Sequence, residues 1–170
     1  MASAWDLSTL IDSLQRDLQA QVDPQNCVMV GIYTGGVWIA RELHQRLGIR
    51  TPLGEIDISF YRDDFSRIGL HPQVKASRLP FSVDGSHLIL VDDVLYTGRT
   101  IRAALNEIFD YGRPDKLTLA VLVDRGLREL PICADVVALK LRSNSADYIK
   151  LRGPSPLSLE FLQGDGTKQP

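Results

Sequence analysis

Hydrophobic residues recur in two different patterns along the 170-residue chain. From Trp5 to Leu18 they recur every three or four positions with charges between them, which predicts an amphipathic helix. Further along, short runs are apolar almost throughout, which is typical of strands buried on both faces of a sheet. These runs predict strands at residues 27–33, 53–61, 87–91, 117–123 and 136–141.

Helical stretches are expected between these strands, at residues 37–47 and 100–111, and each ends at a glycine. Strands that alternate with helices predict an α/β fold, with a mostly parallel sheet flanked by helices. A length of 170 residues fits a single domain, 1–170, with one core.

Three segments depart from the alternation. Residues 62–80 are polar and aperiodic, so we expect a long flexible loop there. Residues 157–162 are expected to form an edge strand, and residues 163–170 a disordered tail.

Composition is that of an ordinary globular protein, with 44% hydrophobic and 24% charged residues. The net charge of -2 does not indicate a nucleic-acid binder, so any basic surface would have to be local. No signal peptide or membrane-length apolar run is visible, which predicts a cytoplasmic protein. Cys27 and Cys133 each lie in an apolar run without a CxxC spacing, so both are expected to be buried free thiols.

Polar residues follow two of the predicted strands, at Thr34-Gly35-Gly36 and at Asp92 to Thr100. Ligands of open α/β sheets bind beyond the carboxyl ends of the strands. In the second segment, a turn at Thr97-Gly98 leads into a helix, so backbone N–H groups, hydroxyls and the positive helix end would face one space. Gly98 permits the positive φ that a close turn needs. This pattern predicts an anion site.

The adjacent carboxylates Asp92 and Asp93 are expected to be exposed at the end of their strand. They would accept hydrogen bonds from vicinal sugar hydroxyls, or hold Mg²⁺ through water. A phosphate site beside a diol site is what a ribose 5-phosphate requires. The acid pair alone also fits a helix N-cap, a receiver-domain pocket or a nucleotide hydrolase, although the chain has no GxxxxGK[ST] motif. Thr34-Gly35-Gly36 alone also fits a plain strand-to-helix turn.

Three strings carry a resemblance to a known family. VDDVLYTGRT (Val91–Thr100) resembles the phosphoribosyl pyrophosphate motif of type I phosphoribosyltransferases. Together with GEIDISFYRDD (Gly54–Asp64) and LAVLVDRGLRELPICAD (Leu119–Asp135), it resembles the bifunctional pyrimidine operon attenuation regulators and uracil phosphoribosyltransferases. The similarity covers about residues 5–140 and is expected to fade beyond them.

This resemblance implies a type I phosphoribosyltransferase fold with a small hood. It implies a reaction of uracil with phosphoribosyl pyrophosphate, giving uridine monophosphate (UMP) and pyrophosphate, with Mg²⁺ held at Asp92 and Asp93. It also implies a non-proline cis peptide at Tyr33–Thr34. The residues that it assigns to phosphoribosyl pyrophosphate are Thr34, Gly35, Gly36, Asp92, Asp93, Thr97, Gly98, Arg99 and Thr100.

The sequence departs from the family pattern at position 35, where Gly replaces the Arg of a Thr-Arg-Gly loop, so one cation near pyrophosphate is missing. A cation from the long loop would supply the charge, with Arg62 taken as catalytic together with Asp92 and Asp93, and with Lys75 or Arg78 as alternatives to Arg62. All three also fit solvated surface charges. Tyr96 occupies a position that is Asp in purine-specific relatives, which favours catalysis by positioning and charge stabilisation over a carboxylate base.

The base would be bound after the fourth strand, by Asp124 and Arg125 and by backbone near Val136 and Val137. Asp124 and Arg125 also fit an ion pair within the chain.

The resemblance further implies a homodimer or homotetramer that binds the leader mRNA of a pyrimidine operon when UMP is bound. Three acidic residues lie between positions 125 and 152. The six basic ones are Arg125, Arg128, Lys140, Arg142, Lys150 and Arg152. That local excess is small, and no paired-aromatic RNA signature is present. Two alternatives stay open: an RNA-binding regulator with a nucleotide-sensing pocket and little catalysis, and a phosphoribosyltransferase for another base.

Overall fold

The computed structural model describes residues 6–59, 76–141 and 147–162. Its elements, in chain order, are α1 (Leu7–Gln19), β1 (Cys27–Ile32), α2 (Gly35–Leu47), β2 (Gly54–Ile56), β3 (His87–Leu95), α3 (Arg99–Tyr111), β4 (Lys116–Asp124), β5 (Val136–Lys140), β6 (Tyr148–Arg152) and β7 (Ser158–Leu162).

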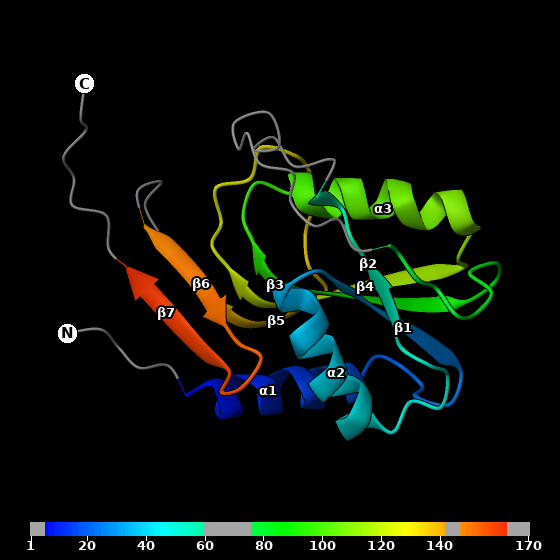
Figure 1. Ribbon diagram of the computed structural model, residues 1–170, viewed down its shortest axis with the longest axis horizontal. Coiled ribbons are helices and arrows are strands. Elements are labelled where there is room, and N and C mark those ends of the chain that lie inside the picture. The colour runs from blue at the N-terminus through cyan, green and yellow to red at the C-terminus, as the bar shows by residue number, and fades with distance from the viewer. Residues whose placement is uncertain (1–5, 60–75, 142–146, 163–170) are drawn as a thin grey trace.

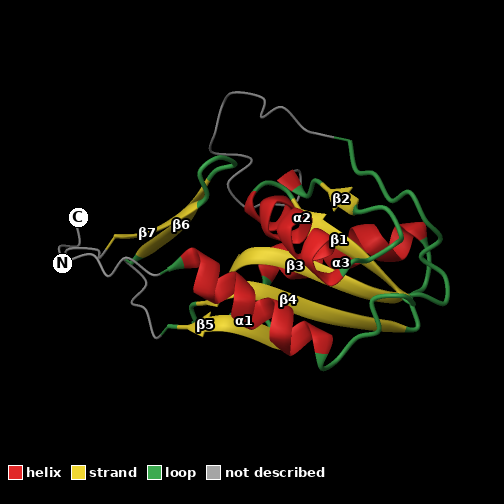
Figure 2. Ribbon diagram, turned by 90° about the horizontal axis from the view of Figure 1, so that it is seen from below, coloured by secondary structure: helices red, strands yellow, loops and turns green. Residues whose placement is uncertain are grey.

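Five strands form one parallel sheet in the order β2-β1-β3-β4-β5. Helix α3 covers one face of this sheet, and α1 and α2 cover the other (Figures 1 and 2). The predicted α/β fold with a parallel sheet flanked by helices is confirmed. Because all five strands run the same way, the loops that follow them gather at one edge of the sheet.

The core lies on both faces of the sheet, which explains why the strand sequences are apolar throughout. Successive strand residues point to opposite faces. In β3, Ile89 and Val91 pack with α1 and α2, whereas Leu88 and Leu90 pack with α3. All four are fully buried.

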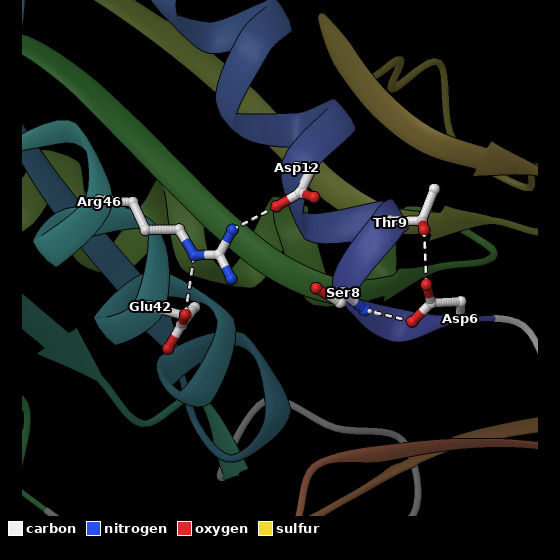
Figure 3. A network of polar contacts seen from close by, with 6 residues as sticks. All are labelled: Asp6, Ser8, Thr9, Asp12, Glu42 and Arg46. Carbon is white, nitrogen blue, oxygen red and sulfur yellow. Dashed lines mark hydrogen bonds and ion pairs between the residues drawn. The ribbon is translucent and has the colours of Figure 1, made fainter.

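Helix α1 is amphipathic as predicted, and its leucines Leu10, Leu14 and Leu18 are buried. Asp6 caps it by accepting hydrogen bonds from Ser8 N at 3.1 Å and from Thr9 Oγ1 at 2.6 Å (Figure 3). These bonds satisfy N–H and O–H donors at the start of the helix.

Helices α1 and α2 are joined at the surface by Arg46, which pairs with Glu42 on its own helix and with Asp12 on α1 (Figure 3). Both carboxylates raise the pKa of Arg46. Exposed pairs of this kind contribute at most about 1 kcal/mol each. The buried leucines therefore contribute most to packing α1 against the core.

Strands β6 and β7 form a separate antiparallel hairpin beside the main sheet (Figure 2). The strand predicted at 157–162 is present, but it pairs with β6 and does not extend the edge of the main sheet. Its partner β6 was not predicted. Ile149 and Leu151 of β6 join the core on the side of α1 and α2.

Several boundaries differ from the prediction. Of the strand expected at 53–61, the described residues up to position 59 contain only Gly54–Ile56 as strand. Within the expected loop 62–80, residues 62–75 lie outside the described residues, and Arg78 forms an antiparallel bridge with Glu55. The predicted tail 163–170 also lies outside them.

The two cysteines differ. Cys27 is buried, and burial raises the pKa of its thiol to about 11. Cys133 is exposed, so the prediction that both thiols are buried is wrong for Cys133. In the described ranges, no helix has the length and apolar character needed to cross a membrane.

Candidate active site at the carboxyl edge of the sheet

Strands β1 and β3 lie side by side, with Gly31 opposite Val91. This register places the residues that follow them next to each other, so Thr34-Gly35-Gly36 lies against Asp92 and Asp93. The peptide bond between Tyr33 and Thr34 is cis, as the family resemblance implied. The two predicted polar segments therefore meet in space.

Gly35 and Gly36 make this contact close, because each lies where a side chain would collide with β3. A Cβ atom on Gly35 would be 2.1 Å from Asp93 Oδ2, and one on Gly36 would be 2.6 Å from the Val91 carbonyl oxygen. Helix α2 begins at Gly35, two residues before its predicted start. The glycines thus let the positive end of α2 approach the carboxylates.

Asp92 and Asp93 differ in exposure. Strand β3 continues through both acids to Leu95, and only 3% of Asp92 is exposed. The expectation that both acids are exposed at a strand end is therefore wrong for Asp92, because β3 continues to pair with β4 up to Leu95. Asp92 Oδ1 accepts a hydrogen bond from Asp93 N, and Asp93 Oδ1 accepts one from Val94 N, each at 3.0 Å. These bonds orient both carboxylates.

The turn from Tyr96 to Gly98 joins β3 to α3. Gly98 has a φ of 93°, a conformation that glycine adopts readily, and α3 begins at Arg99 as expected for an anion-binding loop. The Thr97 hydroxyl accepts a hydrogen bond from Arg99 N at 3.3 Å. The Arg99 side chain pairs with Glu129 at 2.8 Å, so it is already engaged by a carboxylate.

A cavity of about 460 Å³ opens beside the acids. Asp93 and Val94 of β3 line it together with Thr34, Gly35 and Trp38, and residues 148–151 of the hairpin also line it. Tyr148 is half exposed there. The cavity therefore joins both predicted polar segments to a strand that sequence reasoning missed.

The residues predicted to bind the base lie elsewhere. Asp124 pairs with Arg128 at 2.6 Å, not with Arg125. Arg125 is buried, stacks on the Tyr96 ring at 4.1 Å and donates a hydrogen bond to the Asp147 carbonyl oxygen at 2.6 Å.

Val136 and Val137 lie at the start of β5, opposite Ala120 and Val121. At 3.3 Å per residue, this is about 13 Å from the carboxyl end of β4 for Val136. The structure does not bring these two valines to the cavity. The β5 residue opposite Asp124 is Lys140.

One polar network next to Thr34-Gly35-Gly36 was not predicted. The Tyr33 hydroxyl donates a hydrogen bond to Glu55 Oε2, and Arg41 pairs with Glu55 Oε1 at 2.7 Å. Burial, followed by the hydrogen bond to Glu55, raises the pKa of the Tyr33 phenol. The three residues are far apart in the sequence, so no local pattern could have joined them.

The three cations expected to supply positive charge to the site differ in where they lie. Arg62 and Lys75 lie outside the described residues, and Arg78 is exposed beside β2.

Of the six basic residues counted for RNA binding, Arg125 and Arg128 bind carbonyl groups inside the protein. Arg152 pairs with Glu160, and Arg142 lies outside the described residues. Lys140 and Lys150 are exposed.

The acid pair offers two carboxylates to a metal. No group of three or more His, Cys, Asp or Glu that could hold an ion occurs in the described part of the chain. Mg²⁺ commonly takes one or two protein carboxylates and completes its octahedron with water and substrate phosphate. Asp93 lines the cavity and fits that mode of binding, in which the ion arrives with a phosphorylated substrate, whereas only 3% of Asp92 is exposed.

Comparison with known proteins assigns the class. The family model described as "Phosphoribosyl transferase domain" matches residues 6–150. A hypoxanthine phosphoribosyltransferase from Staphylococcus aureus has a TM-score of 0.64 at 20% identity, over 85% of this chain and 78% of that one. A purine phosphoribosyltransferase from Pyrococcus horikoshii has a TM-score of 0.58 at 21% identity, over 80% and 83%. The chain belongs to the phosphoribosyltransferase family, with the fold that these two structures share.

Closer relatives narrow this class. A protein of Nitrosococcus oceani named "Bifunctional protein PyrR" is 53% identical over 95% of this chain and 97% of its own length. Another with the same name, from Pseudomonas paraeruginosa, is 61% identical over 77% of each chain. The chain is a member of the bifunctional PyrR family. The Nitrosococcus match covers nearly the whole chain, so it extends beyond residue 140.

Proposed function

We propose that this protein transfers a phosphoribosyl group to uracil, giving UMP and pyrophosphate, and that it regulates pyrimidine operons by UMP-dependent binding to leader mRNA. The family resemblance of the sequence and the identity to bifunctional PyrR proteins support this proposal. The catalytic part rests on one observation: Asp93 lies against Gly35, and Asp93, Thr34 and Gly35 line the same cavity.

In the proposed reaction, a ring nitrogen of uracil bonds to the anomeric carbon of the ribose. The bond from that carbon to pyrophosphate breaks, and the nitrogen loses its proton to pyrophosphate or solvent. Positive charge develops on the sugar as the leaving group departs. Catalysis then rests on holding the reactants in line and stabilising charge at both ends.

Each end of the substrate has a proposed site. Asp92 and Asp93 bind the ribose hydroxyls, and Mg²⁺ brought with the pyrophosphate binds at the same carboxylates. Thr34, Gly35 and Gly36 face the pyrophosphate. The 5-phosphate binds the turn at Thr97, Gly98, Arg99 and Thr100, where the positive end of α3 favours an anion. Arg62 stays the proposed catalytic cation.

The base requires a pocket beside the anomeric carbon. The cavity that Asp93 shares with Val94 and Tyr148 has the volume and position for a pyrimidine ring, so we place uracil there. Asp124 and Arg125 were predicted as direct contacts, and their interactions support instead an indirect role, in which they hold the turn at Tyr96. Val136 and Val137 lie in the sheet away from this cavity, so we do not place the base beside them.

The enzymatic proposal is tested by incubating the protein with labelled uracil, phosphoribosyl pyrophosphate and Mg²⁺. The expected product is UMP. Unlabelled uracil, hypoxanthine, guanine and orotate then compete in turn, and only uracil should reduce the label in UMP. Preference for one of the other bases would identify the alternative enzyme. A protein that binds phosphoribosyl pyrophosphate but forms no nucleotide with any base would contradict the catalytic proposal.

The regulatory proposal needs its own experiment, because two of the six candidate basic residues bind carbonyl groups within the protein. A gel-shift assay with the leader RNA of a pyrimidine operon should show binding that UMP strengthens. Binding that ignores UMP would exclude nucleotide sensing. The alternative of a regulator with little catalysis predicts UMP-dependent binding together with no turnover. A homodimer or homotetramer and a cytoplasmic location stay predictions from the sequence.

A further inference from the structure

A short segment after β4 packs against the back of the turn that joins β3 to α3. This segment, residues 125–132, is called the backing segment here. Arg125 N donates a hydrogen bond to the Leu95 carbonyl at 2.9 Å. Glu129 N and Leu130 N both donate to the Thr97 carbonyl, at 3.0 and 3.1 Å. The carbonyl groups of the turn are thus directed toward the backing segment.

Arg128 supplies the remaining bond to the turn. Its Nη1 donates to the Tyr96 carbonyl at 2.6 Å and to the Gly126 carbonyl at 3.1 Å, and its Nε donates to the Ile132 carbonyl at 2.8 Å. Its Nη2 pairs with Asp124 at 2.6 Å, and about a fifth of its side chain is exposed. One guanidinium therefore connects the end of β4, the backing segment and the turn.

The direction of these carbonyls sets the direction of the next N–H groups. In a planar trans peptide the C=O and N–H bonds point opposite ways. Because the Tyr96 carbonyl points at Arg128, the Thr97 N–H points away from it. Because the Thr97 carbonyl points at Glu129 N and Leu130 N, the Gly98 N–H also points away. Within the ranges that the structure describes, neither N–H donates a hydrogen bond to a protein acceptor.

Two donors held in one direction, beside the N-terminus of α3, form an anion site whose geometry is set before the ligand arrives. A cation on the carbonyl side of the Tyr96–Thr97 peptide also polarises that peptide, which makes the Thr97 N–H a stronger donor. We propose that Arg128 is a positioning residue for the 5-phosphate: it acts through the Tyr96 carbonyl and does not touch the substrate. This inference rests on the proposed function, because that function supplies the phosphate.

The geometry also predicts that lysine cannot replace Arg128. Lysine keeps the charge at position 128 but places its donors on a single nitrogen, which cannot reach the Tyr96 carbonyl, the Ile132 carbonyl and Asp124 together. Arg128→Lys should therefore behave much like Arg128→Gln. A residue that acted on the phosphate by charge alone would be rescued by lysine.

The test measures binding of ribose 5-phosphate and the kinetics of both substrates for wild type, Arg128→Lys and Arg128→Gln. Both variants should bind ribose 5-phosphate roughly tenfold more weakly, the scale of one hydrogen bond to a charged group. The KM for phosphoribosyl pyrophosphate should rise by the same factor, while the KM for uracil stays unchanged. Arg46→Lys is the matched control, since Arg46 also uses Nε and Nη1 on separate acceptors but lies on α2 away from the turn.

A second measurement uses only the wild-type protein and does not depend on the folding of a variant. In a ¹⁵N-labelled sample, ribose 5-phosphate should shift the amide signals of Thr97 and Gly98 downfield more than those of Glu129 and Leu130. Binding without these shifts, or wild-type affinity in Arg128→Lys, would overturn the role of Arg128 and leave the proposed function standing. Failure of the wild type to bind either ribose 5-phosphate or phosphoribosyl pyrophosphate would overturn both.

Discussion

The two ends of the same parallel sheet are built differently. At the carboxyl end, the N–H groups of Thr97 and Gly98 in the turn after β3 bond to no protein acceptor among the described residues, and Asp93 lines a cavity. Toward the amino end, polar groups bond to each other: His87 contacts the Thr118 hydroxyl at 2.8 Å, and Asp135 accepts from Leu119 N at 2.8 Å. Changes at the carboxyl end should therefore alter binding and catalysis, and changes at the amino end should alter stability alone.

The largest effect is expected at the acid pair. Asp93→Asn, alone or with Asp92→Asn, removes the charge that binds the ribose hydroxyls and the substrate-borne ion but keeps a side chain of the same shape. The rate of UMP formation should fall by roughly a hundredfold or more. Circular dichroism and thermal unfolding check that the fold is retained. A double variant with near wild-type turnover would contradict the assignment of these carboxylates.

Gly36→Ala should cost stability, because its methyl group would collide with the backbone at Val91 and not with a movable side chain. Overpacking of this kind costs about 1–3 kcal/mol, which urea unfolding can measure. Gly85→Ala is the control, since Gly85 has a φ of 69° but open space around its Cβ position. It should show only the strain of the left-handed conformation, about 1–2 kcal/mol. Wild-type stability in Gly36→Ala would argue against close contact between α2 and β3.

Gly35→Ala should have a smaller effect on stability and a distinct effect on function. The atoms in its way belong to the Asp93 side chain, which can rotate. Rotation breaks the Asp93 bond to Val94 N, so the KM for phosphoribosyl pyrophosphate should rise severalfold.

A double-mutant cycle tests whether Gly35→Ala weakens substrate binding through the Asp93 side chain. In the Asp93→Ala background, Gly35→Ala should change neither stability nor substrate binding further. Additive losses would show that the two positions act independently.

The smallest effect is expected at the amino end. Burial, followed by the charge of Lys116, lowers the pKa of His87. The unfolded chain then binds more protons near pH 6.5, so His87 contributes stability above that pH and the contribution is lost as the pH falls through the folded pKa. In His87→Gln, the free energy of unfolding between pH 5 and 8 should depend less on pH. The specific activity at pH 8 should stay unchanged, and a large drop in it would break the contrast between the two ends.

The sequence predicted the strands of the sheet and the turn that carries the site, because each of them is encoded by neighbouring residues. An apolar run, two acids, Thr97-Gly98 and an amphipathic stretch follow one another in the chain, and they became β3, the turn and α3. The burial of Asp92 was missed because it depends on how far β3 pairs with β4, which neither strand encodes alone. The position of Val136 was missed for the same reason, since it depends on the register of β5.

The long basic side chains were harder to predict. Arg125 and Arg128 look like surface charges in the sequence, because their partners are main-chain carbonyls that no residue type reveals. Strand β6 was missed because its alternation is short, with Ile149 and Leu151 as its buried positions. The cavity therefore could not be predicted, since β6 forms one of its walls.

The most direct test of the carboxyl-end site is a calorimetric titration of phosphoribosyl pyrophosphate, with Mg²⁺, into wild type and the variant carrying Asp92→Asn and Asp93→Asn. The site described here predicts saturable binding at one site per chain in the wild type. In the double variant, binding should be at least tenfold weaker, and omission of Mg²⁺ should weaken the wild type. Equal affinity in the two proteins, or no binding in the wild type, would contradict the placement of the substrate at the end of β3.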